Sequence, residues 1–483
     1  METRRRVMTY TVIAVVGLGL IGWLTARYMV KRSLLLQLGT SDLKARVEPT
    51  RRLLEMKKLE VSLPAQPIIR RSKAAEALGE IGTEEAMRLL GVILRDQEEA
   101  PRRWARRALV KQGIRAVPTL MAALPAGGGT TEEAVKGLVE IAQTSPQVAP
   151  DVRLLLADRS ALAPAAEILS KTGEVGIRAL IQGCYNADGD LRKAAMKNLG
   201  LQRVKAAVDA CLDNLRPIPG SEKGAAITAL GLIGDRRAAP AIIPFLTDQG
   251  NRTAAATALG LIGDPRAVEP LVATLSATER EYRAAAILAL RRIGPPAFPA
   301  LVRELKSPDV LFRRGAASAL IGSRSAQVNG PLAAALRDPD ADVRASAASA
   351  LGWQGNTAAI DPLVAALSDP SWRVVDASVE ALGEIGVSGI DRLAAVLGST
   401  GSVTVSYQIS RALGHMGSAA VPKLISLLSS GNPNVQKWSA VALGAIGDPR
   451  AVEPLKELAK VAQGDLKWVV DEQLRLIVGI RSS

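Results

Sequence analysis

The sequence predicts an all-α protein, a solenoid of about fourteen two-helix repeats preceded by one transmembrane helix. Residues 258–275 (ALGLIGDPRAVEPLVATL) and 442–458 (ALGAIGDPRAVEPLKEL) are nearly the same, and the leucine of the ALG triplet recurs along the chain at a nearly constant interval. Such self-similarity is typical of repeat architectures. A third observation, an uncharged stretch near the N-terminus, predicts the membrane helix. The marker leucines are Leu78, Leu109, Leu138, Leu169, Leu199, Leu230, Leu259, Leu290, Leu320, Leu351, Leu382, Leu413, Leu443 and Leu474.

The N-terminal stretch predicts a membrane anchor. Residues 1–6 are a basic N-terminus with three arginines, and residues 7–26 (VMTYTVIAVVGLGLIGWLTA) hold no charged side chain. A helix of this length matches a hydrocarbon layer of roughly 30 Å, so a transmembrane helix is predicted over residues 7–30. A cleaved signal peptide is the alternative, because the arginines also make a basic n-region. Basic residues after the span slightly favour a cytoplasmic array, whereas a signal anchor would place the array on the opposite side.

Residues 31–69 are predicted to be a basic juxtamembrane segment or linker, followed by the repeat array over residues 70–483. Positions 1–76 hold 15 Lys and Arg against 6 Asp and Glu, while positions 77–483 hold 46 against 41. Most of the positive excess therefore lies beside the predicted span. There, the basic residues between 27 and 73 are predicted to contact anionic lipid headgroups. A solvated linker without lipid contact is the alternative.

Each repeat is predicted to hold two helices, as residues 340–367 (DADVRASAASALGWQGNTAAIDPLVAAL) illustrate. Val343, Ala347 and Leu351 recur at helical spacing and predict the first helix, here called helix A. Gly355 suits the left-handed conformation that commonly closes a helix. A proline follows most markers at a similar interval and suits the first turn of the second helix, helix B. Such a pair cannot bury both apolar faces alone, so it must stack on its neighbours.

The pattern ALGxIGDPRAVEPLVxAL resembles the HEAT repeat, in the short form named after the phycobilisome lyase subunits. The resemblance covers roughly residues 70–480 and implies a right-handed α-α superhelix. It does not single out one function, because adaptors, enzyme subunits and some DNA-binding proteins share this scaffold. Three places depart from the pattern: residues 127–130 read GGGT, residues 160–173 lack the ALG triplet, and residues 398–404 weaken the twelfth repeat.

One stretch, RRWARRALVKQGIR, is a candidate partner-binding patch. Spacings of three and four residues place several of its basic side chains on one helical face around a tryptophan. An ordinary solvated helix surface is the alternative. The patch consists of Arg102, Arg103, Trp104, Arg106, Arg107 and Lys111.

A basic residue also lies seven positions before the marker in nine of the fourteen repeats. Stacking would align these residues in a row. We expect the row to pair with acids of neighbouring repeats, such as Asp190, Glu281 and Asp342, and with helix ends; binding of an acidic partner is the alternative. The row consists of Arg71, Arg102, Arg192, Lys223, Arg252, Arg283, Arg313, Arg344 and Lys467.

Four tryptophans are candidate aromatic anchors for a partner. Only 3% of the residues are aromatic, so a large ring in this alanine-rich array is either an oversized core residue or an exposed contact. Tryptophan is favoured at binding hot spots. Spacing leaves both interpretations open and slightly favours the core. The four are Trp353, Trp372, Trp438 and Trp468.

The sequence offers little catalytic chemistry. Its one histidine, His415, follows the marker glycine at a variable position and is predicted to be an ordinary interhelix residue. No CxxC, HExxH or GxxxxGK[ST] motif occurs. Cys184 and Cys211 are predicted to be buried free thiols rather than a disulfide. No catalytic residue, metal ligand or cofactor is therefore predicted.

These observations predict a membrane-anchored, non-catalytic scaffold that binds protein or peptide partners on the surface of the solenoid. An enzyme or enzyme subunit of the bilin-lyase-like kind is a second hypothesis, which the resemblance alone suggests. A nucleic-acid binder is a third, although the small net charge of the array predicts weak affinity. No small-molecule substrate is predicted. The predicted location is a single-pass membrane protein, with the array slightly favoured on the cytoplasmic side.

Overall fold

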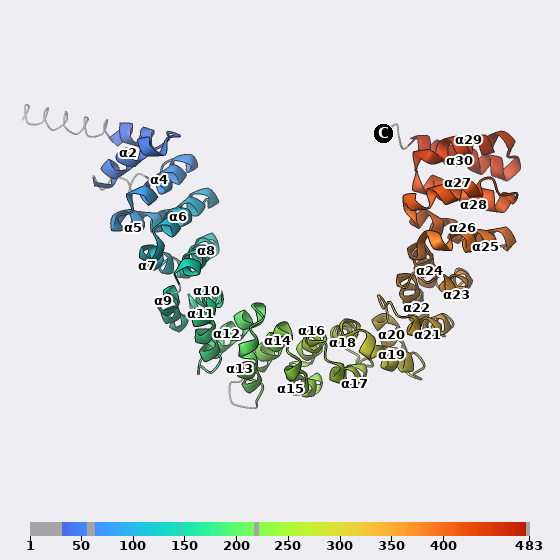
Figure 1. The fold of residues 1–483 in the computed structure, drawn as a ribbon, viewed down its shortest axis with the longest axis horizontal. Coiled ribbons are helices and arrows are strands. Elements are labelled where there is room, and N and C mark those ends of the chain that lie inside the picture. The colour runs from blue at the N-terminus through green and yellow to red at the C-terminus, as the bar shows by residue number, and fades with distance from the viewer. Residues whose placement is uncertain (1–30, 56–62, 146, 217–221, 480–483) are drawn as a thin grey trace, which may run out of the picture. The chain divides into compact units, whose positions relative to one another are not determined.

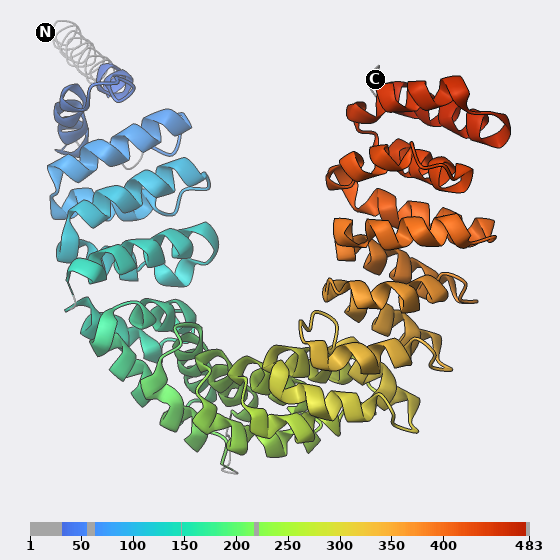
Figure 2. The same cartoon turned by 45° about the vertical axis from the view of Figure 1, so that its right-hand side comes forward.

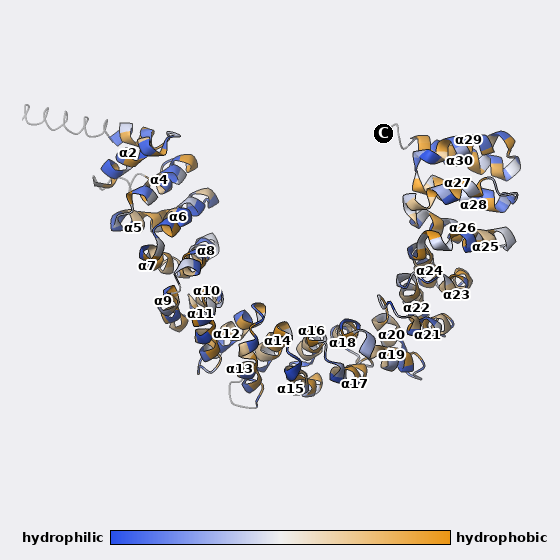
Figure 3. Cartoon of the chain, viewed as in Figure 1, coloured by the Kyte–Doolittle hydropathy of each residue, from blue (hydrophilic) through white to orange (hydrophobic). Residues whose placement is uncertain are grey.

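The computed structural model describes residues 31–55, 63–145, 147–216 and 222–479, and all regular elements in these ranges are helices. The predicted all-α solenoid is confirmed for this part of the chain, whereas the number of repeats and the handedness stay predictions. The chain divides into two compact units, Met1–Ala229 and Leu230–Ser483, which are described separately. Helices of both units carry hydrophilic and hydrophobic residues together (Figure 3), as stacked amphipathic helices require.

Unit 1 is a stack in which A and B helices alternate (Figure 1). Residues 31–37 are helical, and α2 (Leu43–Glu55) follows them. The A helices are α4 (Ile68–Ile81), α6 (Glu99–Lys111), α8 (Gly128–Thr144), α10 (Leu162–Ser170) and α12 (Gly189–Leu201). The B helices are α5 (Glu84–Ile93), α7 (Val117–Met121), α9 (Val148–Leu154), α11 (Gly173–Gly183) and α13 (Val208–Asp213). Helix α14 (Lys223–Ile233), also an A helix, crosses the boundary between the units.

Unit 2 continues the alternation, and its successive A helices lie side by side (Figures 1 and 2). The A helices are α16 (Arg252–Ile262), α18 (Arg280–Ile293), α20 (Val310–Ala319), α22 (Ala341–Trp353), α24 (Trp372–Ile385), α26 (Val403–His415), α28 (Pro433–Ile446) and α30 (Gly464–Gly479). The B helices are α15 (Ala239–Ile242), α17 (Val268–Val272), α19 (Phe298–Glu304), α21 (Asn329–Ala335), α23 (Ile360–Ala366), α25 (Ile390–Ser399), α27 (Val421–Leu427) and α29 (Val452–Val461).

Short 3-10 helices connect many A helices to the next B helix. The sequence predicts only a turn at these places. Those before B helices are η1 (Gly113–Ala116), η4 (Lys205–Ala207), η5 (Arg236–Ala238), η7 (Pro265–Ala267), η8 (Pro295–Ala297), η9 (Ala326–Val328), η10 (Thr357–Ala359), η11 (Gly386–Gly389), η12 (Gly417–Ala419) and η13 (Pro449–Ala451). Those within or after B helices are η2 (Leu124–Ala126), η3 (Leu155–Ala157) and η6 (Ile243–Thr247).

The repeated letters GDPR form one of these turns. Gly263 closes α16 with a φ of 67°, in the left-handed region that glycine adopts without strain. The carboxylate of Asp264 then accepts a hydrogen bond of 2.9 Å from the backbone N–H of Arg266 and caps η7. The Arg266 guanidinium folds back onto Asp264 at 2.8 Å and donates to the carbonyl of Arg236 in the preceding repeat at 3.0 Å.

The second copy of this sequence, at residues 442–458, folds in the same way. Gly447 closes α28 with a φ of 70°, Asp448 caps η13, and Arg450 donates to the carbonyl of Ser418 at 3.0 Å. The motif therefore combines a helix stop, a helix cap and a link to the preceding repeat. These three structural roles explain why nearly the same sequence occurs at residues 258–275 and 442–458.

The ALG triplet forms the contact between successive A helices. The marker leucines are buried, except that Leu474 on α30 is only partly buried. A Cβ atom placed on Gly260 would lie 2.6 Å from the Cα atom of Ala289, the alanine of the next triplet. On Gly352 it would lie 2.5 Å from the Cα atom of Ala381. We call this backbone contact between the glycine of one triplet and the alanine of the next the Gly–Ala seam.

The predicted row of basic residues has a structural role wherever its contacts are seen. Arg344 binds both carboxylate oxygens of Asp369, at 2.7 and 2.9 Å. Its third guanidinium nitrogen donates to the carbonyls of Asp338 and Pro339, at 2.8 and 3.1 Å. One side chain therefore fixes the loop before its own helix and also binds the loop of the next repeat. Bidentate charged hydrogen bonds of this kind are among the stronger ones.

The acids that the row binds are not those that the sequence suggests. Arg71 pairs with Asp96 and Arg313 with Asp338, and each acid lies just after the helix B that follows. Of the acids named in advance, Asp342 pairs with Arg314 and Arg373, and Asp190 with Lys193. None of these three partners belongs to the row. The reason is geometric, because Arg71, Arg313 and Arg344 point away from their own helix toward the loop that ends the next helix B. Lys467, in contrast, pairs with Asp471 on its own helix.

The segment before the array is helical in its described part. Leu38 and Leu53 are fully buried, and Arg46 forms an ion pair of 2.6 Å with Glu76 on α4. The ammonium group of Lys73 donates to the carbonyl of Gly39 at 2.7 Å. Helix α2 and the residues around it therefore pack against α4.

The predicted basic N-terminus (1–6) and transmembrane helix (7–30) lie outside the described residues. Within the described ranges, no single helix is both long and apolar enough to cross a bilayer. One pair of helices, Arg280–Ile293 and Pro295–Glu304, is together long and apolar enough to cross a bilayer, but the chain bends by 114° between the two helices.

Candidate binding surfaces

The predicted basic patch lies on α6, and two of its arginines have acidic partners on the protein itself. Arg106 is mostly buried and pairs with Glu133 at 2.8 Å and also with Glu140. Arg103 pairs with Glu99 one turn earlier on the same helix. Burial alone would raise the pKa of Glu133, but the hydrogen bonds from Arg106 and Lys136 outweigh it and hold this pKa below its usual range.

The remaining members of the patch are also engaged. Lys111 pairs with Glu80 on α4 at 2.6 Å. The guanidinium of Arg102 donates to the carbonyls of Asp96 and Gln97, at 2.7 and 2.6 Å. Arg107 lies over the ring of Trp104, 5.4 Å from its centroid, as in a cation–π pair. The structure therefore brings the six predicted residues together on one helix, where most of their charge is used to hold α6 to its neighbours.

The four tryptophans divide into one buried and three exposed side chains. Trp438 is 7% exposed, donates from Nε1 to the Asn434 side chain at 2.9 Å and meets Tyr407 edge to face at 6.3 Å. Trp353, Trp372 and Trp468 are 50%, 72% and 69% exposed. The core interpretation, slightly favoured by spacing, therefore holds for Trp438 alone.

Other apolar side chains are exposed on the same A helices of unit 2. Val403 begins α26 as Trp372 begins α24, and it is equally exposed. Tyr407 is half exposed and lies six residues before its marker leucine, as Trp468 does. We call Trp353, Trp372, Val403, Tyr407 and Trp468 the aromatic surface of unit 2. Large exposed apolar side chains in such number are typical of surfaces that bind a partner.

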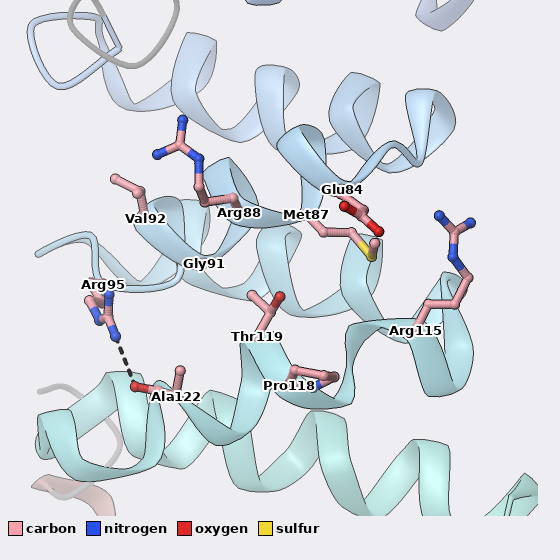
Figure 4. A pocket seen from close by; sticks show the side chains of 10 residues that line it. All are labelled: Glu84, Met87, Arg88, Gly91, Val92, Arg95, Arg115, Pro118, Thr119 and Ala122. Atoms are coloured by element: carbon pink, nitrogen blue, oxygen red, sulfur yellow. Dashed lines mark hydrogen bonds between the residues drawn. The ribbon is translucent and has the colours of Figure 1, made fainter.

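A groove between the B helices α5 and α7 of unit 1 has a different character (Figure 4). It encloses about 760 Å³, and Gly91, Thr119 and Ala122 are among the small residues that line it. Three arginines and one glutamate also line it, together with Met87, Val92 and Pro118. We call it the arginine groove. Its charged members are Glu84, Arg88, Arg95 and Arg115.

Two arginines of this groove are fixed by backbone carbonyls rather than by carboxylates. Arg95 donates to the carbonyl of Ala122 at 2.8 Å, and Arg115 donates to the carbonyl of Gly82 at 3.2 Å. In the sequence, Arg115 stands at the end of the basic stretch RRWARRALVKQGIR, and nothing singles out Arg95. No local signal connects the two, because stacking alone brings them to one groove.

A larger hollow of about 1030 Å³ lies among α8, α10 and α12. It forms where the repeats depart from the pattern, because α10 has only nine residues. Its charged residues largely pair with one another: Lys136 with Glu132 and Lys171 with Glu167. The sequence shows which repeats are irregular, but not that a hollow results.

The groups with catalytic or redox potential are few in the described ranges. Cys184 and Cys211 are buried free thiols, and the hydrogen bond with Cys184, together with burial, raises the pKa of Cys211. His415 is exposed, and its Cβ atom would lie 2.8 Å from a Cβ atom on Gly383 of the preceding A helix. No three His, Cys, Asp or Glu side chains of the described residues cluster as metal ligands would.

Comparison with protein families matches HEAT repeats to residues 220–291, 328–403 and 390–474. HEAT repeats are therefore present within residues 220–474. This finding confirms the resemblance of the ALGxIGDPRAVEPL pattern to HEAT repeats in that part of the chain. Comparison of the chain with curated proteins gives no match.

The HEAT-repeat chain is similar to several solved structures. For the karyopherin Kap121p the identity is 14% and the TM-score 0.43, over 94% of this chain and 57% of Kap121p. For human deoxyhypusine hydroxylase the identity is 23% and the TM-score 0.24, and the match covers 50% of this chain and 97% of the hydroxylase. For the CpcE–CpcF phycocyanin lyase complex from Nostoc the identity is 26% and the TM-score 0.26, and the match covers 50% of this chain and 93% of the lyase chain. The chain thus spans little more than half of Kap121p, and likenesses this distant assign it no activity or partner.

Proposed function

We propose that the protein is a non-catalytic HEAT-repeat scaffold that binds other proteins through the aromatic surface of unit 2. One observation carries the proposal: Trp372 and Trp468, on the A helices α24 and α30, are 72% and 69% exposed. Water contact with so much apolar surface is unfavourable, and fully burying a large apolar side chain contributes about 1.5–3 kcal/mol. A partner that covers these rings would supply that contribution.

The geometry supports a protein partner rather than a small molecule. The aromatic surface is spread over α22, α24, α26 and α30, which is a wide area for one small ligand. Protein interfaces combine such a wide area with a few aromatic anchors. Truncation of a tryptophan at a hot spot weakens binding by about 2 kcal/mol or more, which is roughly thirtyfold in affinity.

We also propose that residues 7–30 anchor the scaffold in a membrane as a single span. The uncharged stretch supports this proposal, and the basic residues between 27 and 73 would then contact anionic headgroups. The array would hold its partners at that membrane, on the cytoplasmic side if the basic residues set the orientation. Protease protection of the array in intact and opened cells tests the side, and deletion of residues 1–30 should release the chain from the membrane fraction.

Crosslinking and capture with the full chain test the partner proposal. Trp372→Ala and Trp468→Ala should reduce the recovery of the partners that wild type captures, whereas Leu261→Ala should leave recovery unchanged. Leu261 is the matched control because it is exposed and lies two residues after its marker on α16, as Trp353 does on α22. Equal recovery by all three variants would contradict the proposal, as would turnover of a small molecule by purified chain that captures no protein.

A further inference from the structure

We propose that the arginine groove of unit 1 binds an extended acidic segment of a partner protein. The inference rests on the proposed function as a protein-binding scaffold, and it adds a second contact site with a defined partner chemistry. The groove lies between two B helices of unit 1, whereas A helices of unit 2 carry the aromatic surface, so variants of different residues test the two sites separately.

The charge of the groove points to an acidic partner. Arg88, Arg95 and Arg115 line it against a single carboxylate, that of Glu84. A backbone carbonyl fixes the position of a guanidinium but does not cancel its charge. Arg95 and Arg115 each use one guanidinium nitrogen on such a carbonyl, and a guanidinium has five N–H donors in all. The remaining donors of these two side chains are available to carboxylates of a partner.

Most of the neighbouring patch on α6 is compensated by acids. There Arg103, Arg106 and Lys111 each face a carboxylate of the protein itself. A partner carboxylate would have to displace those acids before it could bind. Arg102 donates to two backbone carbonyls and Arg107 lies over Trp104, but neither lines the arginine groove with Arg95 and Arg115.

The groove also sets the spacing of the acidic residues. Arg95 lies just beyond the C-terminal end of α5, and Arg115 reaches Gly82 just before its N-terminal end, so the two flank the helix (Figure 4). The ten residues of α5 span about 15 Å. An extended chain covers this length in about five residues. The partner segment should therefore carry two acidic residues about five positions apart.

The side of the groove next to α7 suits uncharged residues between those acids. Met87, Pro118 and Thr119 lie between Arg95 and Arg115 in Figure 4, and Gly91 keeps this part of α5 free of a side chain. Arg88 also lies on this stretch of α5, but its guanidinium points away from Pro118 and Thr119 (Figure 4). A methionine adapts its shape to irregular apolar groups more readily than a branched side chain does. The inferred ligand is thus acidic, then uncharged over about four residues, then acidic again.

Binding of labelled peptides to the full chain in detergent micelles tests the inference by fluorescence anisotropy. The first probe is an eight-residue peptide with glutamates at positions 2 and 7 and uncharged residues elsewhere. Two comparison peptides carry lysines at positions 2 and 7, or glutamates at positions 4 and 5. We expect the first peptide to bind at least about tenfold more tightly than either comparison peptide, which corresponds to about 1.4 kcal/mol.

Charge reversal locates the site. Arg95→Glu and Arg115→Glu should each weaken binding of the first peptide about tenfold, whereas Arg178→Glu should leave it unchanged. Arg178 is the matched control because it is exposed on α11, another B helix, and pairs with Glu174 within that helix. A peptide with one glutamate changed to lysine should bind Arg95→Glu better than it binds wild type. If a glutamate variant fails to fold by circular dichroism, the glutamine variant takes its place.

Two results would overturn the inference: equal binding of the acidic and lysine peptides, or unchanged binding after charge reversal at Arg95 and Arg115. Binding of anionic vesicles at these arginines without peptide binding would assign the groove to lipid and would also overturn it. Trp372→Ala and Trp468→Ala should leave peptide binding unchanged. Unchanged partner capture in those variants, with peptide binding still weakened by charge reversal, would contradict the proposed function alone. Reduced partner capture in those variants, with peptide binding unchanged after charge reversal, would contradict the groove alone.

Discussion

A single methyl group added to the Gly–Ala seam should destabilise the array. In Gly260→Ala the new Cβ atom would lie 2.6 Å from Cα and 2.8 Å from Cβ of Ala289. Carbon atoms in ordinary contact are about 3.5–4.0 Å apart, so α16 and α18 would have to separate by about 1 Å. Because the nearest atom is backbone, no side-chain rotation relieves the clash. Forced expansion of a packed core costs about 1–3 kcal/mol.

Helix propensity opposes this loss of stability, because alanine favours a helix more than glycine does. A control variant measures the size of this opposing effect. Alanine favours a helix over glycine by about 1 kcal/mol, so we expect Gly260→Ala to lower the free energy of unfolding by up to about 2 kcal/mol in total. Gly330→Ala on α21 adds the same methyl group where nothing lies within 4 Å. It should be neutral or stabilise by about 0.4–1 kcal/mol through the unfolded state.

Urea unfolding followed by far-UV circular dichroism measures both variants, with the m-value showing whether the unfolding transition has changed. Repeat arrays can unfold in parts, so hydrogen exchange in α16 and α18 provides the local measurement. Gly260→Ala should destabilise the chain less when it is made in an Ala289→Gly background than in wild type, since that background removes the second contact but not the first, and the double-mutant cycle separates this coupling from the helix propensity of each residue. If Gly260→Ala were as stable as Gly330→Ala, the seam would not be the close contact described here.

The other expected outcomes concern the core, the row of basic residues, acid stability and the thiols. Leu259→Ala should lower the free energy of unfolding by about 2–5 kcal/mol as a core truncation, and Leu474→Ala, at a partly buried marker, should lower it less; similar urea midpoints for the two would contradict this. Arg344→Ala removes the guanidinium that donates to Asp369 and to two loop carbonyls, and it should lower the free energy of unfolding by about 1.5–3 kcal/mol. Urea unfolding measures this loss against Arg178→Ala, which breaks only an exposed ion pair. The hydrogen bond from Arg344 holds the pKa of Asp369 below its usual range, so the folded state binds the proton less readily than the unfolded chain. The resulting stability is present above the unfolded pKa of about 3.9 and is lost as pH falls through the folded pKa; Asp369→Asn should therefore flatten the acid limb of stability against pH, and an unchanged limb would count against the pair. Because hydrogen bonding and burial raise the pKa of Cys211, Cys184 and Cys211 should react with a thiol reagent at pH 8 only in denaturant, and fast labelling of the native chain would show that they are accessible.

The repeat itself could be predicted from the sequence because each of its parts acts locally. A glycine at a helix end, an aspartate two residues before a backbone N–H, and a leucine at helical spacing all work within one helix or turn. Gly263, Asp264 and Leu259 illustrate the three cases, and the structure shows all of them in these roles. The Gly–Ala seam joins neighbouring repeats, but it still follows the sequence pattern, since the ALG triplet recurs with the same period as the repeat.

The binding surfaces could not be predicted in the same way because they depend on how repeats stack. Trp438 and Trp468 look alike in the sequence, yet they lie at adjacent positions relative to their markers, five and six residues before, and only the first turns inward. Arg95 and Arg115 are separated in the sequence by the whole of α6 and share a groove only through the packing of α5 on α7. The position relative to the marker decides exposure, whereas residue type alone does not.

The Gly–Ala seam has a consequence for how such a chain acquires new partners. The position six residues before the marker lies about two turns from the seam glycine on the same helix, and in four successive repeats it holds Asp376, Tyr407, Lys437 and Trp468. The first three also contact the next repeat: Asp376 pairs with Arg411, Tyr407 meets Trp438 edge to face, and Lys437 pairs with Asp465. A substitution there changes one side-chain contact and the chemistry offered to a partner, whereas the backbone contact of the seam is unchanged, so recognition can diverge one repeat at a time while the helix spacing is kept.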